Sequence, residues 1–207
     1  QGVDEIPHLF VYTQFLLSLS QNEAMYATTD TKDKFWATWK ENYSKKEISD
    51  LEKLINQKLQ PKEMENLFSS RENWQKEKMK ELWNSGKRIP SIQDKSIYSL
   101  LRPERLLELV QRFIVFDNKE KKVPRYQQYF AVKEKIKKVT DVKGDSPRSG
   151  GVIWHTTGSG KSITMVLLAK AISLEPSIQD PKVILVTDRV DLDDQIYKTF
   201  KNCGKEV

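Results

Sequence analysis

The order of apolar and polar positions divides the chain into three stretches of different character. Residues 1–42 contain two short β-prone runs, 15–20 and 24–28, joined by a polar turn. An aromatic cluster on a predicted helical turn follows them, with members Phe35, Trp36 and Trp39. A segment of this size is too small to bury a core of its own. We therefore expect it to be the last part of a larger domain.

Residues 43–118 follow a helical pattern, with apolar positions three and four residues apart. Pro61, Gly86 and Pro90 punctuate the pattern at predicted helix boundaries. Pro103 suits the first turn of a further helix, whose apolar face would be Leu106, Leu109, Val110 and Phe113. The lysines and glutamates here are typical of solvated helix faces. We interpret this stretch as a linker or packing module and not as an active site.

Residues 119–207 change to a pattern in which helices alternate with apolar runs. A basic amphipathic helix is predicted over 125–138. The runs 152–154 and 183–186 are typical of parallel strands buried on both faces, and an amphipathic helix is predicted after each. The second of these helices is expected to have Asp191 as its N-cap. The predicted fold class is α/β, with the beginning of a parallel sheet.

Composition narrows the function only a little. The 207 residues carry a net charge of +6, which permits a polyanionic partner without establishing one because lysines and acids are interleaved. Cys203 is the only cysteine, so an internal disulfide is excluded and a reducing, cytoplasmic setting fits. No apolar stretch approaches the roughly 20 residues of a membrane span, and we expect no membrane partner.

The strongest chemical signal is the segment 155–162, His-Thr-Thr-Gly-Ser-Gly-Lys-Ser, between an apolar run and a helix. Its two glycines let the backbone approach a phosphate, and the helix N-terminus adds positive potential. Lys161 would reach the β- and γ-phosphates, and the Ser162 hydroxyl would help to hold Mg²⁺. The alternative is a plain Gly/Ser-rich turn. The predicted cofactor-binding residues of the loop are Thr157, Gly158, Ser159, Gly160, Lys161 and Ser162.

Two further positions are candidates for function. Gln128 lies among aromatic residues before the loop, and its side-chain amide can both donate to and accept from adenine, although the pattern alone favours packing in a core. Asp188 ends the second apolar run, where some ATPases place a Mg²⁺-binding acid. Arg189 follows it in place of a second carboxylate that would orient a hydrolytic water. We therefore favour a structural or DNA-contact role for Asp188, and we expect ATP binding without efficient turnover.

Other chemistries find no support in the sequence. Two histidines and one cysteine make no zinc ligand set. No Gly-x-Ser-x-Gly elbow is present. Glu41, Asp50 and Glu52 do not accompany a strand-borne lysine as a nuclease centre requires. We expect any nuclease centre to precede residue 1.

Several blocks resemble the R (restriction and motor) subunit of type I restriction-modification enzymes. Residues 150–162 resemble its motif I, in which a histidine at the position of His155 is normal. Residues 185–195 resemble its motif Ia. The other similar blocks, in the family's order, are 5–12 (the end of the nuclease domain), 105–116 (the segment joining nuclease and motor) and 125–132 (the adenine-reading glutamine motif).

The resemblance implies a superfamily 2 DNA translocase fused to a PD-(D/E)xK-type nuclease. It implies that the parent enzyme couples ATP-dependent translocation of double-stranded DNA to endonucleolytic cleavage. Its partners would be modification and specificity subunits, with S-adenosylmethionine entering only through the holoenzyme. The implied domains are the C-terminal remnant of the nuclease domain (1–42), a helical linker region (43–118) and the N-terminal part of the first RecA-like motor domain (119–207).

Residue by residue, the resemblance implies that Gln128 reads adenine and that the loop binds ATP with Mg²⁺. It also implies that Thr187 and Arg189 approach the DNA backbone. The nuclease carboxylates, the acidic motif II and the later motor motifs have no counterpart in these residues, so the chain alone is expected to be inactive. The alternatives are another superfamily 2 helicase, a type III restriction motor, and a truncated non-catalytic module that binds ATP, DNA or the modification complex.

Overall fold

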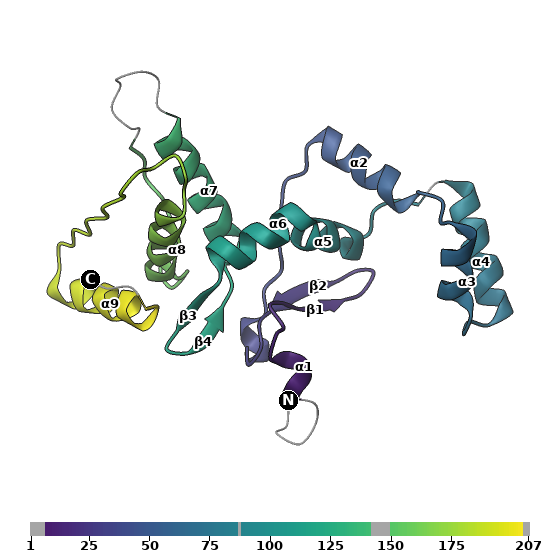
Figure 1. The fold of residues 1–207 in the computed structure, drawn as a ribbon, viewed down its shortest axis with the longest axis horizontal. Coiled ribbons are helices and arrows are strands. Elements are labelled where there is room, and N and C mark those ends of the chain that lie inside the picture. The colour runs from purple at the N-terminus through teal and green to yellow at the C-terminus, as the bar shows by residue number, and fades with distance from the viewer. Residues whose placement is uncertain (1–6, 87, 142–149, 205–207) are drawn as a thin grey trace. The chain divides into compact units, whose positions relative to one another are not determined.

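The computed structural model describes residues 7–86, 88–141 and 150–204. The chain forms two compact units (Figure 1). The first unit combines residues 1–17, 25–39 and 103–207, and the second combines 18–24 and 40–102. The predicted boundaries after residues 42 and 118 state which domain of a larger enzyme each segment would belong to. The division into compact units does not test this assignment, so the boundaries stay a prediction.

The second unit is helical, as predicted from its apolar spacing. Ser44 and Glu47 form a capping box at its first helix, and Gly86 ends the third with a left-handed backbone (φ +58°). Leu51 and Leu100 are buried where the first and last helices pack. Pro61 lies after the end of the first helix, as predicted, and it is also the first residue of the second helix. The helices are α2 (Lys45–Ile55), α3 (Pro61–Phe68), α4 (Asn73–Ser85) and α5 (Ile92–Leu101).

Two small two-stranded sheets are present among the described residues. Strands β1 (Leu16–Leu19) and β2 (Ala24–Ala27) confirm the first predicted pair of strands. Strands β3 (Val115–Asp117) and β4 (Glu120–Lys122) are antiparallel. Asn118 and Lys119 join them with positive φ values of 55° and 70°, which is the backbone of a tight hairpin turn.

The remaining elements belong to the first unit. The helix predicted from Pro103 changes character after Glu108, where a π-helical turn begins. The last helix begins at Val190 with Arg189 as its extended N-cap residue, so the predicted cap at Asp191 is wrong and that residue lies in the first turn. The elements are α1 (Pro7–Phe10), η1 (Asp33–Phe35), α6 (Pro103–Glu108), η2 (Leu109–Phe113), α7 (Tyr126–Thr140), α8 (Lys161–Ser173) and α9 (Val190–Asn202).

The core of the first unit lies where α7, α8 and η2 pack together. Val132, Val166 and Leu167 are fully buried there, which removes their apolar surface from water. The segment 25–39 joins this core through Trp39, whose ring centroid lies 5.4 Å from that of Tyr129 on α7. Residues from the two ends of the chain therefore share one core.

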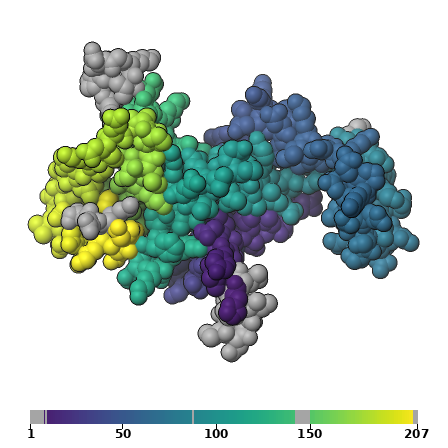
Figure 2. All heavy atoms as spheres, viewed as in Figure 1, coloured from purple at the N-terminus to yellow at the C-terminus, as the bar shows by residue number. Residues whose placement is uncertain are grey.

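The two apolar runs predicted as buried parallel strands are neither strands nor buried in this structure. Trp154, Ile184 and Val186 are 90%, 85% and 89% exposed, and most of the segment between α8 and α9 lies at the surface (Figure 2). A strand needs a neighbour for its backbone N–H and C=O groups. No described residue pairs with either run. The prediction of strands was wrong here, while the coarser description, a mixture of helices and strands, holds.

Among the described residues, no helix combines the length and the apolar character that a membrane crossing requires. The predicted polar loop 143–151 lies mostly outside the described residues, as do Glu5 and Ile6 of the first similar block.

Candidate nucleotide-binding site

The loop before α8 has the backbone that its glycines predict. Gly158 and Gly160 have φ values of +76° and +82°, a region that residues with a Cβ rarely adopt. Ser159 closes the turn, because its backbone N–H and its hydroxyl both donate to the Thr156 carbonyl, at 3.3 and 2.7 Å. Gly160 is then the N-cap residue of α8. The loop is therefore followed immediately by the N-terminus of α8.

Gln128 connects α7 to this loop. Its Nε2 donates to the carbonyl oxygens of Gly160 and Ser159, at 3.1 and 3.4 Å. Its Oε1 accepts from the backbone N–H of Arg125 at 2.9 Å, which caps the first turn of α7. The Gln128 side chain is buried. The structure thus brings together two predicted site features that are about thirty residues apart in sequence.

The same contact explains why position 160 is a glycine. A Cβ at Gly160 would lie 2.8 Å from the Gln128 Nε2, well inside van der Waals contact. At Gly158, in contrast, a Cβ would meet no atom within 4 Å. Both positions have a positive φ, and a side chain at position 160 would in addition displace the amide end of the Gln128 side chain.

A cavity of about 530 Å³, which we call the loop pocket, opens beside Gln128 and the loop. Its volume lies in the usual range for small-molecule sites, roughly 300–1,000 Å³. Three stretches of the first unit supply its walls: the N-terminal segment after β2, the approach to α7, and the loop itself. The lining residues are 26–32, Phe35, Ala37, 120–125, Gln128, 158–160 and Ile163.

Of the predicted cofactor-binding loop residues, 158–160 line this pocket, whereas Thr157, Lys161 and Ser162 lie outside its lining. Lys161 is exposed, and its ammonium donates to the His155 carbonyl at 3.2 Å. The Ser162 hydroxyl accepts from the Gln195 side chain at 3.5 Å. Thr157 is exposed. The buried Nδ1 of His155 has no hydrogen-bond partner within the described chain.

These features fit a nucleotide phosphate chain better than a protein-bound metal. The open space at Gly158 and the exposed Lys161 leave room for an anion at a helix N-terminus. Across residues 7–86, 88–141 and 150–204, no group of three or more metal-ligating side chains occurs.

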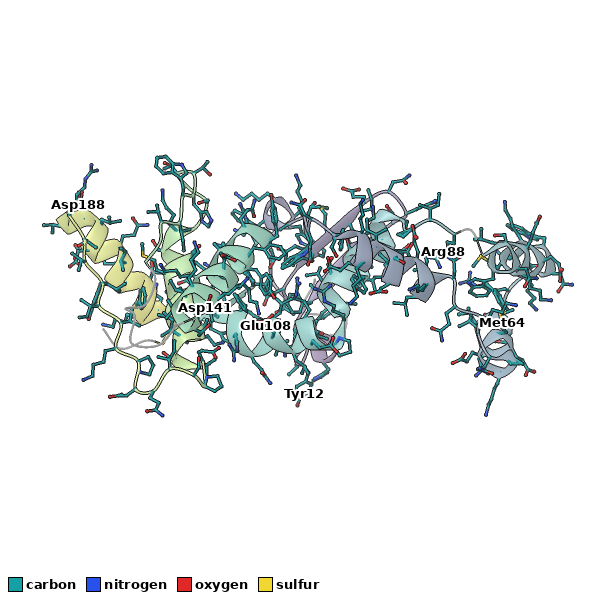
Figure 3. All side chains as sticks on the ribbon, turned by 90° about the horizontal axis from the view of Figure 1, so that it is seen from above. Tyr12, Met64, Arg88, Glu108, Asp141 and Asp188 are labelled. Carbon is teal, nitrogen blue, oxygen red and sulfur yellow. The ribbon has the colours of Figure 1, made fainter. Side chains whose placement is uncertain are left out.

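The residues predicted to contact DNA lie at the start of α9. The Thr187 hydroxyl donates to the Asp193 carboxylate at 3.2 Å, across the first turn of the helix. Arg189 and Asp188 are exposed, and Figure 3 labels Asp188 beside the N-terminal end of α9.

Sequence reasoning missed the contribution of the segment after β2. The Tyr26 hydroxyl donates to the Pro124 carbonyl at 2.8 Å, and the Thr28 hydroxyl donates to the Lys121 carbonyl at 2.9 Å. Burial raises the pKa of Tyr26 above its ordinary value, so its hydroxyl stays a donor. These bonds fix one wall of the loop pocket. Neither residue belongs to a recognisable motif, and no sequence signal would have identified them.

Comparisons with known proteins support the interpretation of this region. The family model described as "SWI2/SNF2 ATPase" matches residues 127–207, which include Gln128 and the loop. The endonuclease subunit of the type I restriction enzyme HindI, from Haemophilus influenzae, is 40% identical over 116 residues, which are 52% of this chain and 11% of that subunit. The chain is related to the endonuclease subunits of type I restriction enzymes.

Other endonuclease subunits of this kind match as well. The putative MjaVIIIP subunit of Methanocaldococcus jannaschii is 30% identical over 159 residues, or 70% of this chain and 14% of that protein. The SauCOLORF180P subunit of Staphylococcus aureus is 31% identical over 109 residues, or 52% of this chain and 11% of that protein. The chain thus spans only a small part of these curated relatives. No solved structure gives a significant match.

Proposed function

We propose that the loop pocket binds ATP with Mg²⁺. The observation that carries this proposal is the pair of hydrogen bonds from Gln128 to the loop, beside a cavity of about 530 Å³. The Nε2 donors of Gln128 are used by the loop carbonyls, and Oε1 accepts from Arg125. The second lone pair of Oε1 would accept from the N6 amino group of adenine. Lys161 and the amides at the start of α8 would hold the phosphates. Bound Mg²⁺ would neutralise part of the phosphate charge.

We further propose that this site serves a DNA motor. In the parent subunit, ATP would drive translocation of double-stranded DNA coupled to endonucleolytic cleavage. The support is the relation to restriction endonuclease subunits together with the match to an ATPase family. Thr187 and the exposed Arg189 would approach the DNA backbone. Modification and specificity subunits would be the protein partners in the cytoplasm, and S-adenosylmethionine would act only through that complex.

The test of ATP binding uses the 207-residue chain and a fluorescent ATP analogue in the presence of Mg²⁺. We expect saturable binding that Lys161→Ala weakens by about tenfold or more, since a charge-assisted contact to phosphate is lost. The matched control is Lys137→Ala, which removes another exposed lysine of the same unit. Equal affinities for wild type and Lys161→Ala would overturn the assignment.

A second candidate function is a binding module without catalysis. It is favoured by one observation: Asp188 is exposed and followed by Arg189, so a pair of carboxylates to hold Mg²⁺ and orient water is missing at this position. Saturable ATP binding without hydrolysis by the isolated chain would favour this candidate for the chain itself. Hydrolysis at the rate of a complete motor would exclude it.

A further inference from the structure

The turn from α6 into η2 is hydrogen-bonded to α7, the helix that carries Gln128. Glu108, the last residue of α6, accepts a hydrogen bond from the Tyr129 hydroxyl and another from the Lys133 ammonium, each at 2.5 Å. Tyr129 and Lys133 lie one turn apart on α7. Hydrogen bonds to a charged carboxylate are stronger than neutral ones. One carboxylate, labelled in Figure 3, therefore holds one side of α7 at two points.

The same turn is also tied to α8, the helix that begins at the loop. Arg112 in η2 donates to the Glu175 carboxylate at 2.9 Å and to the Leu174 carbonyl at 3.4 Å, just past the end of α8. In addition, the Lys170 ammonium of α8 donates a hydrogen bond of 2.7 Å to the carbonyl of Ile114, the residue after η2. These contacts hold the far end of α8 against the π-helical turn.

Buried aromatic packing reinforces this arrangement. The Phe113 ring lies 4.7 Å from that of Tyr129, the neighbour of Gln128. The guanidinium of the buried Arg105 lies 4.6 Å from the centroid of the same Tyr129 ring. Such cation–π contacts are strongest when water is excluded. The α7 residue next to Gln128 is therefore fixed from α6 and from η2.

The Gln128 contact to the loop tolerates little movement. Its two donor bonds measure 3.1 and 3.4 Å, and hydrogen bonds become weak beyond about 3.5 Å. A shift of α7 relative to α8 by a few tenths of an ångström would weaken the longer bond further. The position of both helices is therefore a requirement of the site.

We propose that Glu108 and Arg112 are positioning residues of the nucleotide site. By holding α7 and α8 to the same turn, they keep Gln128 beside the loop. There the second lone pair of its Oε1 would accept from the N6 amino group of adenine and would repel the O6 carbonyl of guanine. This inference rests on the proposed ATP site, and it assigns to the segment before the motor region a direct influence on base selectivity. Neither residue lines the loop pocket.

The test measures the ratio of ATP to GTP affinity in the 207-residue chain, by competition with a fluorescent ATP analogue. Tyr129→Phe removes a single oxygen and keeps the ring packing, while Glu108→Gln removes the charge. We expect both to lower the preference for ATP by roughly threefold to tenfold. Arg112→Gln should act in the same direction, and the conservative Arg112→Lys should restore part of the preference. Lys137→Gln, on the exposed side of α7, is the control and should leave it unchanged.

The outcomes separate the two proposals. Wild-type chain that binds no adenine nucleotide overturns the ATP site, and this inference with it. If Gln128→Ala loses the preference for ATP while Glu108→Gln and Tyr129→Phe keep it, the positioning role alone is overturned, even where the thermal midpoint falls. Should Glu108→Gln fail to fold, Tyr129→Phe decides by hydrogen exchange of the peptide 156–163, which we expect to become faster. Unchanged exchange and unchanged selectivity would refute the role.

Discussion

At the scale of single residues, the loop is specified by conformations that few side chains permit. Gly160 combines a φ of +82° with an approach of 2.8 Å between its virtual Cβ and Gln128. Gly204 has a similar φ of +67°, but a Cβ there would meet open space. Substitution of Gly204 would therefore cost only the strain of the left-handed backbone, whereas substitution of Gly160 would also displace Gln128.

We predict that Gly160→Ala lowers the free energy of unfolding by more than Gly204→Ala does. The left-handed backbone costs about 1–2 kcal/mol in both variants, and displacement of Gln128 adds to it only at position 160. Urea unfolding measures the stabilities, and the fluorescent ATP analogue measures binding, which should be lost in Gly160→Ala alone. Equal effects at the two positions would show that the Gln128 contact carries no weight.

The ion pair between Arg112 and Glu175 gives a prediction that depends on pH. The hydrogen bond from Arg112 holds the pKa of the Glu175 carboxyl below its ordinary value. A lowered pKa in the folded chain means that the pair stabilises above the ordinary pKa of a glutamate, about 4.3, and is lost as the pH falls through the folded value. Arg112→Gln should therefore reduce stability by about 1 kcal/mol at neutral pH, since the pair is partly buried.

Unfolding in urea at pH 7 and at pH 3 checks this expectation. The difference between wild type and Arg112→Gln should shrink at the lower pH. The exposed pair Lys80–Glu77, whose side chains are 49% and 75% exposed, supplies the control. Lys80→Gln should change stability little at either pH. A difference that stays constant or grows on acidification would contradict the assigned cause.

At the scale of elements, helices followed the sequence closely, while the predicted parallel strands did not. A helix satisfies its own backbone groups, so spacing and caps such as Ser44 suffice to place it. The run 183–186 has strand composition, but a strand needs a paired neighbour, and no described residue provides one. The π-helical turn η2 is a third case, because the apolar spacing from Pro103 is equally compatible with a regular helix.

We predict that the exposed run contributes little to the stability of this chain. Ile184→Thr should change the free energy of unfolding by less than about 0.5 kcal/mol, as expected for a surface position. Leu167→Ala, at a fully buried position of α8, should cost about 2–5 kcal/mol. Chemical unfolding of both variants provides the comparison. A cost above about 2 kcal/mol for Ile184→Thr would indicate that the run is buried as a strand in solution.

At the scale of the whole molecule, the proposed ATP site and its surroundings lie within the first unit. That unit unites the segment 25–39 with residues after 103, so the wall of the loop pocket comes from both ends of the sequence. The interpretation of residues 1–42 as the remnant of a nuclease domain stays a prediction, and the structure adds that residues 25–39 pack with residues after 103.

We predict that the 207-residue chain binds ATP without hydrolysing it at the rate of a motor. The physical reason is that Asp188 is followed by a cation in place of a second carboxylate, so water is not oriented for attack. A coupled assay of ADP release, with and without double-stranded DNA, measures the rate. Lys161→Ala serves as the background control. Turnover above that background that rises with added DNA would refute the prediction.

The sequence by itself determined the backbone of the loop and predicted its chemistry. Two glycines, a lysine and a serine at fixed spacing specify a local backbone and a local charge, and both are properties of adjacent residues. Composition and apolar spacing likewise placed most helices, because helical hydrogen bonds close within a few residues.

Only the tertiary structure decided which distant residues meet. The position of Gln128 against the loop, the wall formed by Tyr26 and Thr28, and the grip of Glu108 on α7 all join residues that are twenty to one hundred positions apart. The same holds for the two apolar runs, whose state depends on whether another strand pairs with them. Local conformational preferences place helices and turns. Burial and strand pairing depend on contacts between residues that are distant in the sequence, and local patterns do not specify those contacts.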